Sequence, residues 1–123
     1  METIYTYTRA QALSDGTQVN LDNLKDCHNL RHELGIKYPV FLTSGVQQII
    51  NESLNYGCNE LSGVALDILV MFRLAAKVGK SEFKVYIYWK RNTTKLFSFI
   101  AECGAFDIDN PEPAITIMLI DEC

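Results

Sequence analysis

The chain has 123 residues, of which 48% are hydrophobic and 21% charged, and its formal net charge is −4. This size and composition are typical of one globular domain with a real core, so residues 1–123 are expected to form a single domain and a disordered chain is excluded. The net negative charge argues against a protein that binds the phosphates of nucleic acid.

A short N-terminal helix is the first well-marked element. Residues 3–8 alternate weakly, as in a strand. Thr8 and Gln11 have the spacing of a capping box, which predicts that a helix begins directly after Thr8. Gly16 can end this helix in the left-handed conformation. Residues 18–21 then alternate as a short extended segment.

Two further helices are expected before the middle of the chain. A polar helix with a thin apolar stripe is predicted over residues 22–34, with Gly35 as its end. Pro39 favours extended backbone before it, so residues 40–42 are a short extended run. A Ser-x-x-Gln capping box then predicts a helix over about residues 44–56.

Residues 62–79 form the strongest helical pattern. Apolar side chains recur with helical spacing and fill most of the circumference, which indicates a buried helix covered on two or more sides. Ser62 is a possible cap and Gly79 a stop. The segment is too short, and too interrupted by charges, to be a convincing membrane span.

The last third of the chain changes to a period of two. Residues 83–90, 96–103 and 114–120 read as strands, with a loop at 104–113 rich in Gly, Asp, Asn and Pro. The expected fold class is therefore α+β: a three-stranded antiparallel C-terminal meander packed on the buried central helix, with smaller N-terminal helices.

Successive side chains of a strand point to opposite faces of the sheet, so the residues of these strands divide into two sets. One face is expected to meet the central helix. The other face is too apolar to lie comfortably in water, and we expect the N-terminal helices to cover it, with a protein partner as the alternative. Its members are Tyr86, Tyr88, Leu96, Ile100, Thr116, Met118 and Ile120.

The cysteines and the N-terminus indicate a compartment. Cys27, Cys58, Cys103 and Cys123 form no Cys-x-x-Cys pair, and the first residues have neither the basic nor the apolar region of a secretory signal. These features predict reduced thiols in a cytoplasmic protein, with Cys103 packed in a strand.

Known catalytic and metal-binding patterns are weak in this sequence. His28 and His32 are four residues apart on a predicted helix, but a structural zinc needs four ligands, so a solvated pair is the better interpretation. No persuasive Ser-His-Asp or Cys-His set and no glycine-rich phosphate loop is present. We therefore expect no metal, no cofactor and no catalytic residue.

Arg9, Asp15 and Asp67 are the residues of an alternative ligand site. Arg9 lies beside a predicted helix start, where backbone amides favour an anion. Asp67 lies among apolar residues of the central helix, where a carboxylate must be hydrogen-bonded, paired or exposed. Capping explains the first group, and a structural anchor that bonds a loop backbone or Arg9 explains Asp67 equally well.

Nucleic-acid binding is a further alternative. Tyr86, Tyr88 and Trp89 alternate with basic residues, as in surfaces that stack single-stranded bases. Packing within a sheet explains the same pattern. The basic residues gather in 73–95 and the acidic ones in 102–122, which also suits charge pairing between neighbouring strands.

Three stretches resemble a known family: IYTYTRAQALSDGTQVNL at the start, KYPVFLTSGV in the middle and EPAITIMLIDEC at the end. The chain is similar there to small proteins of unknown function carried by bacteria, plasmids and phages. Two tryptophans of that family's central block are absent here, whereas its aspartate is retained as Asp67. The resemblance implies no enzymatic activity and a mobile-element context, in which small acidic proteins often bind and modulate host or rival machinery.

The leading hypothesis is therefore a small non-catalytic cytoplasmic binding or regulatory protein, of phage or mobile-element origin, that acts on host or defence machinery. Its partner is another protein or a second copy in a homodimer, and no membrane is involved. The expected surface is the tyrosine and methionine side of the sheet (Tyr86, Tyr88, Met118) or the acidic loop (Asp107, Asp109).

Overall fold

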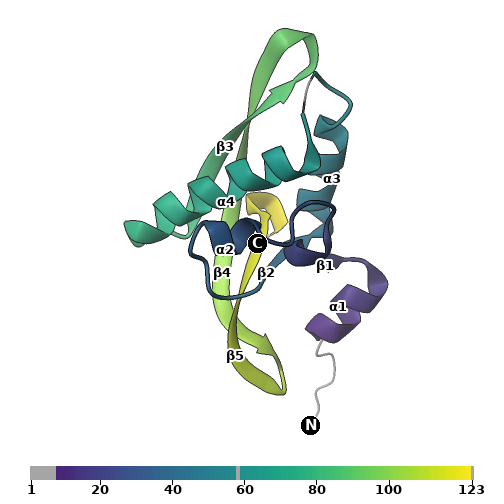
Figure 1. The fold of residues 1–123 in the computed structure, drawn as a ribbon. Helices are drawn as coiled ribbons and strands as arrows, with labels where there is room; N and C mark the ends of the chain where they lie inside the picture. The colour runs from purple at the N-terminus through teal and green to yellow at the C-terminus, as the bar shows by residue number, and fades with distance from the viewer. Residues whose placement is uncertain (1–7, 58, 123) are drawn as a thin grey trace.

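Five strands form one mixed sheet in the computed structural model, which describes residues 8–57 and 59–122. The order across the sheet is β1, β2, β5, β4, β3 (Figure 1). The bounds are Gln18–Asn20 for β1, Val40–Thr43 for β2, Glu82–Trp89 for β3, Thr93–Asp107 for β4 and Asn110–Leu119 for β5. The predicted α+β class is confirmed. The weak alternation at residues 3–8 lies almost wholly outside the described residues.

The expected three-stranded antiparallel meander is only part of this sheet. β3, β4 and β5 pair antiparallel as predicted. However, β2 pairs parallel with β5, with Val40 opposite Ile115, and β1 pairs antiparallel with β2. Local sequence indicates extended backbone in both N-terminal segments, but their pairing joins residues far apart in the chain, which no local pattern determines.

The helices are divided between the two faces of the sheet. α3 (Ser44–Ser53) and α4 (Leu61–Lys77) lie against one face, with α2 (Leu30–Glu33) beside α4 (Figure 1). α1 (Arg9–Asp15) packs near β1. The 3₁₀ turns η1 (Leu21–Asn23), η2 (Lys90–Asn92) and η3 (Ile120–Glu122) connect or follow strands.

The central helix is predicted correctly in position and in part in its surroundings. α4 runs close to the expected 62–79 and buries one face, with Ile68 and Leu69 at its centre. Its outer side is uncovered: Leu74 is 51% exposed and Val78 69%. The expected cover on two or more sides is present in part: β3, α3 and α2 contact α4, whereas its outer side is exposed. Among the described residues, no helix is long and apolar enough to cross a membrane.

The core forms where the strand alternation predicts it. The odd-numbered residues of β3, β4 and β5 point toward α3 and α4. The Phe83 ring lies 6.1 Å from Phe72 of α4 and 5.6 Å from Phe99 of β4, measured between centroids. The buried strand residues are Phe83, Val85, Ile87, Trp89, Phe97, Phe99, Ala101, Ile115 and Ile117.

The second face of the sheet carries less cover than expected. α1 has only seven residues and contacts β1 and the Asp107 end of β4, so it leaves the β3 side of this face uncovered. Tyr86 is 68% exposed and Leu96 41% exposed on the same face. The N-terminal helices that were expected to cover these side chains are replaced by β1, β2 and helices on the opposite face.

β4 and β5 extend through the segment predicted as a loop. They pair as far as Asp107 and Asn110, with a register shift between Ala105 and Asp107. Pro111 and Pro113 are tolerated here because β2 pairs only with residues 115–117 of β5, so this part of β5 has one neighbouring strand. Cys103, expected to be packed in a strand, lies in β4 opposite Ile115 but is exposed.

Local signals for helix ends are confirmed at some positions and wrong at others. The capping box of Thr8 and Gln11 is present, and Gly16 adopts a left-handed conformation with φ of 80°. The predicted helix 22–34 is reduced to η1 and α2. α3 and α4 form, but neither N-cap residue, Thr43 nor Glu60, makes a side-chain capping bond.

Candidate functional site

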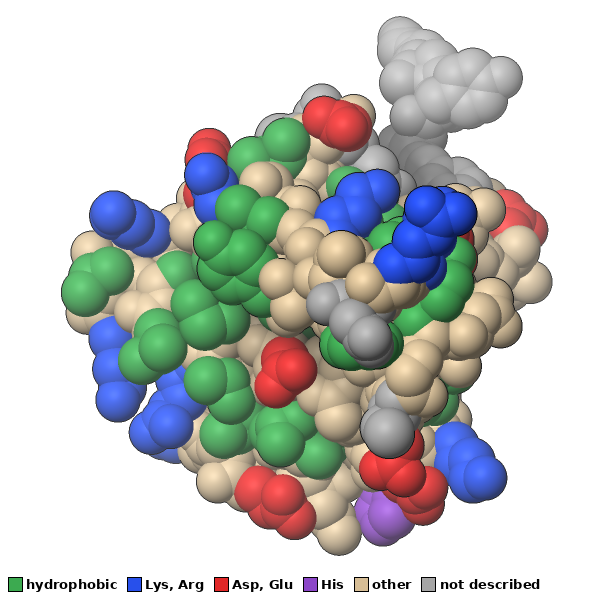
Figure 2. Space-filling view, turned by 90° about the horizontal axis from the view of Figure 1, so that it is seen from above, with side chains coloured by type: hydrophobic (Ala, Val, Ile, Leu, Met, Phe, Trp, Pro, Cys, Tyr) green, Lys and Arg blue, Asp and Glu red, His purple; other side chains and the backbone are tan. Residues whose placement is uncertain are grey.

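Exposed apolar side chains gather around strand β3, and we call this set the apolar band. Met71 and Tyr86 line one hollow, and Tyr86 lies opposite Leu96 in the strand register. Figure 2 shows hydrophobic side chains together on one side of the molecule, bordered by Lys and Arg. Single exposed apolar residues are ordinary, but a continuous group is typical of a binding surface. The band consists of Met71 and Leu74 on α4, Val78 directly after α4, Tyr86 on β3, Leu96 on β4 and Ile120 on η3.

The α4 part of the band follows one line along the helix. Asp67, Met71, Leu74 and Val78 are separated by four, three and four residues, which is the spacing of a helix–helix seam. Asp67 has no hydrogen bond or ion pair within the described part of the chain. Partial desolvation raises the pKa of its carboxyl group above the ordinary value. The anchor role that was one interpretation of Asp67 therefore has no contact to support it.

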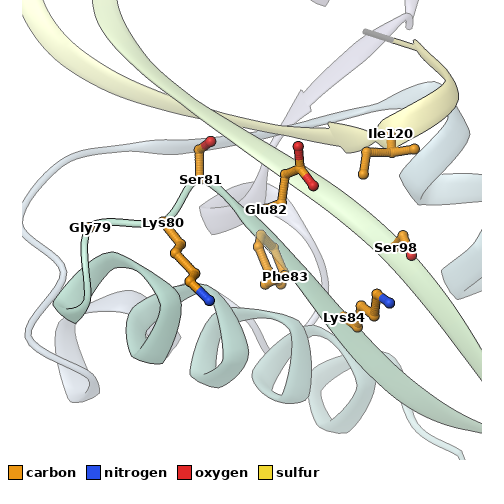
Figure 3. A pocket seen from close by; sticks show the side chains of 8 residues that line it. All are labelled: Gly79, Lys80, Ser81, Glu82, Phe83, Lys84, Ser98 and Ile120. Atoms are coloured by element: carbon orange, nitrogen blue, oxygen red, sulfur yellow. The ribbon is translucent and has the colours of Figure 1, made fainter.

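A shallow hollow of about 500 Å³ lies at the start of β3. Glu82, Ser98 and Ile120 lie on one side of the β3–β4 ribbon, whereas Phe83 points toward α4 (Figure 3). The lining residues are Gly79, Lys80, Ser81, Glu82, Phe83, Lys84, Ser98 and Ile120. This open, mixed surface suits a side chain of a protein partner better than an enclosed small molecule.

β3 is an edge strand whose outer backbone groups are available. The carbonyl of Ser81 accepts a 2.9 Å hydrogen bond from the Ala101 amide of β4, whereas the carbonyl of Tyr88 accepts a 2.8 Å bond from Asn59 Nδ2 outside the sheet. Backbone groups alternate in direction along a strand, so even-numbered residues point away from β4. The outward N–H and C=O groups of Glu82, Lys84 and Tyr86 have no protein partner in the described structure.

Arg9 connects α1 to four strands, β1, β2, β4 and β5. Its Nη1 donates to Gln18 Oε1 at 2.8 Å and to Thr116 Oγ1 at 3.0 Å, and its Nε donates to the Phe106 carbonyl. The guanidinium also lies 4.2 Å from the centroid of the Phe41 ring. Burial lowers the pKa of Arg9, an effect that a nearby carboxylate opposes. Arg9 is therefore a half-buried anchor whose guanidinium donates to groups within the chain.

Asp107 supplies the anion at the N-terminus of α1. Its Oδ1 accepts from the Arg9 amide and its Oδ2 from the Ala10 amide, each at 3.0 Å. Oδ1 also accepts a 2.8 Å bond from the Ile108 amide. The pKa of Asp107 is lowered by the Ile108 bond first and then by the bonds to α1 and the Arg9 charge. The predicted anion position is thus occupied by the chain itself.

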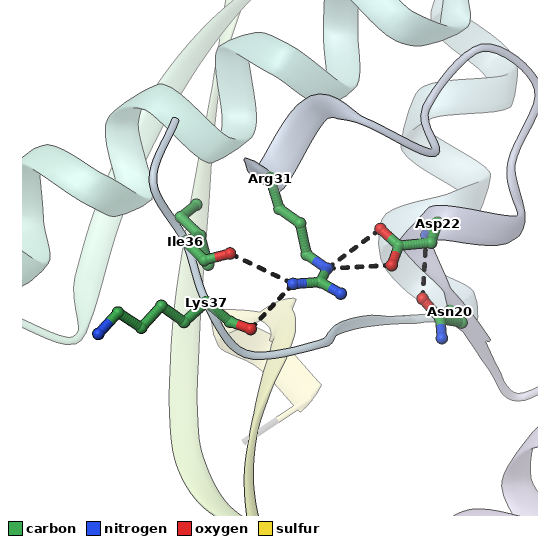
Figure 4. A network of polar contacts seen from close by, with 5 residues as sticks. All are labelled: Asn20, Asp22, Arg31, Ile36 and Lys37. Carbon is green, nitrogen blue, oxygen red and sulfur yellow. Dashed lines mark hydrogen bonds and ion pairs between the residues drawn. The ribbon is translucent and has the colours of Figure 1, made fainter. Parts of the chain in front are cut away.

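A second arginine fixes the segment between β1 and β2. Arg31 Nε lies 3.0 Å from Asp22 Oδ2, and Arg31 Nη1 donates to the carbonyls of Ile36 and Lys37 (Figure 4). Asp22 is held in turn by a bond from its amide to Asn20 Oδ1. This network stabilises the turns that replace the predicted helix 22–34.

The structure does not gather the predicted ligand residues into one site. Arg9 contacts β1, β2, β4 and β5, and Asp15 is exposed at the end of α1. Asp67 lies on α4 beside Val85 and Tyr86 of β3, the opposite edge strand.

The predicted interaction residues are also divided. Tyr86 is the exposed member, whereas Tyr88 and Met118 are half-buried. A Cβ added to Gly57 would collide with the Tyr88 ring, so the turn after α3 packs on this tyrosine. Asp107 points to α1, and Asp109 is exposed in the β4–β5 turn.

In the described part of the chain, the residues considered for metal binding and base stacking are not arranged for either role. His28 and His32 are exposed, and the described residues contain no group of three or more His, Cys, Asp or Glu side chains placed to hold a metal ion. Trp89 is buried against Tyr56 and Phe97, so its ring does not present a face for base stacking. Cys27 is buried, while Cys58 and Cys123 lie outside the described residues.

Comparisons with protein-family models, curated proteins and solved structures give no match for this chain.

Proposed function

We propose that this protein is a non-catalytic binding protein that holds another protein on the apolar band around β3. The observation that carries the proposal is the gathering of exposed apolar side chains beside an edge strand with unpaired backbone groups. Apolar centres with polar borders are typical of protein interfaces. Edge strands are ready templates for a further strand.

The partner proposed is a host or defence protein of a bacterial cell, which the binding protein meets in the cytoplasm. This narrower proposal is supported by the resemblance of residues 4–21, 37–46 and 112–123 to proteins of mobile elements. The small-ligand alternative has less support, because the side-chain donors of Arg9 bind Gln18, Thr116 and the Phe106 carbonyl within the chain.

Capture from a bacterial lysate tests the proposal. Leu96→Lys combined with Ile120→Lys adds two charges to the part of the band on the second face, so we expect loss of the proteins that the wild type retains. Leu13→Lys is the matched control, because Leu13 is an exposed leucine on α1, away from the band. Equal retention by the wild type and the double variant, or retention of nothing by either, would contradict the proposal.

A further inference from the structure

We propose that the chain forms a two-fold symmetric dimer in which the β3 strands of two copies pair antiparallel and their α4 helices pack against each other. The inference rests on the proposed function, because it assigns the α4 and β3 part of the apolar band to a second copy. The part of the band at Leu96 and Ile120 stays available for a different protein.

The unpaired backbone groups limit where the two strands can meet. Outward groups are available at Glu82, Lys84 and Tyr86. The far end of the strand is closed, since the Tyr88 carbonyl accepts from Asn59 Nδ2. Pairing is therefore confined to the first half of β3, which starts at Glu82.

The charges in this half select one register. A two-fold axis at Phe83 places Glu82 of each copy opposite Lys84 of the other, in two opposite-charge pairs that stabilise antiparallel strands. An axis at Lys84 places two lysines opposite each other, which is unfavourable. An axis at Val85 places Glu82 opposite Tyr88, whose outward carbonyl is already bonded.

The two-fold axis at Phe83 also allows the α4 helices of the two copies to pack against each other. The rings of Phe83 and Phe72 lie 6.1 Å apart, so an axis through Phe83 passes close to Phe72, midway along the seam from Asp67 to Val78. Antiparallel packing about that point sets Met71 opposite Leu74 and Asp67 opposite Val78 of the second copy, along the seam spacing of this helix. Asp67, unpartnered within its own chain, then lies near the basic residues Lys77 and Lys80 of the second copy.

Charge reversal tests both the dimer and its register. In size-exclusion chromatography with light scattering, we expect the wild type to approach the dimer mass as concentration rises. Glu82→Lys and Lys84→Glu are each expected to weaken the dimer about tenfold or more, because each creates two like-charge pairs. The double variant carrying both changes restores the opposite pairs and is expected to regain the wild-type affinity.

Control measurements distinguish a specific loss of the dimer from a loss of folding or a general effect of charge. Both side chains are exposed, so circular dichroism is expected to show unchanged folding for each variant. Glu112→Lys makes the same charge change at an exposed position on β5 and is expected to leave the dimer intact. A wild type that is monomeric at every concentration, or a dimer indifferent to the single reversals, would overturn this inference. A monomer that still captures a lysate protein would leave the proposed function standing.

Discussion

Replacing Arg9 by methionine is expected to lower the free energy of unfolding by about 3 kcal/mol, at roughly 1 kcal/mol for each of three side-chain hydrogen bonds. The bonds lost are those to Gln18, Thr116 and the Phe106 carbonyl. Methionine also removes the guanidinium from the face of the Phe41 ring, so the measured change includes this cation–π contact. Urea unfolding followed by fluorescence measures the change.

Arg73→Met is the matched control for this prediction. Arg73 is exposed on α4 and has no hydrogen bond or ion pair in the described structure. We expect its replacement to change the free energy of unfolding by less than about 0.5 kcal/mol. Equal effects of the two substitutions would show that Arg9 is not the anchor of α1.

Asp107→Asn is expected to destabilise the protein at neutral pH and to have a shrinking effect as the solution is acidified. The fold holds the pKa of Asp107 below its ordinary value, so the folded state binds fewer protons than the unfolded chain in that range. The stabilisation is complete above the ordinary carboxyl pKa of about 4 and is lost as pH falls through the lowered value. Urea midpoints measured from about pH 7 to pH 2 follow this change.

Asp109→Asn provides the control in the same hairpin turn. Asp109 is exposed and makes no hydrogen bond in the described structure, so its replacement should leave the pH profile unchanged. A destabilisation by Asp107→Asn that is equal at all pH values would contradict the assignment of its carboxylate as the anion that caps α1.

Much of the fold is readable from local pattern. The Thr8 and Gln11 spacing locates α1, the apolar repeat locates α4, and period-two alternation separates the core face of β3 from its outer face. These elements are decided by contacts between near neighbours, which the sequence displays directly.

The missing parts depend on partners distant in sequence. Val40 lies opposite Ile115, and the parallel pairing of β2 with β5 turns an isolated extended run into the middle of a sheet. The turns between β1 and β2 are held by Arg31 and Asp22 rather than by helical bonds. Neither arrangement produces a periodic pattern in the sequence, so a short segment of sequence cannot predict it.

The candidate surface was predictable in part. Alternation placed Tyr86 and Leu96 together on a face too apolar for water, and they are exposed as a partner would require. The expectation that the N-terminal helices cover this face pointed away from an exposed surface there. The four, three, four spacing from Asp67 to Val78 is visible in the sequence and is the signal that could have identified the seam on α4. No spacing pointed to Asp107 as the cap of α1, because that contact crosses almost the whole chain.

Hydrogen–deuterium exchange of the β3 amides, compared at low and high protein concentration, tests most directly whether this edge is the binding surface. The amides of Glu82 and Lys84 are expected to exchange rapidly in dilute solution and to become protected as concentration rises. The amides of Phe83 and Val85, which point to β4, are expected to be protected at both concentrations. New protection elsewhere, with the β3 edge unchanged, would contradict the account.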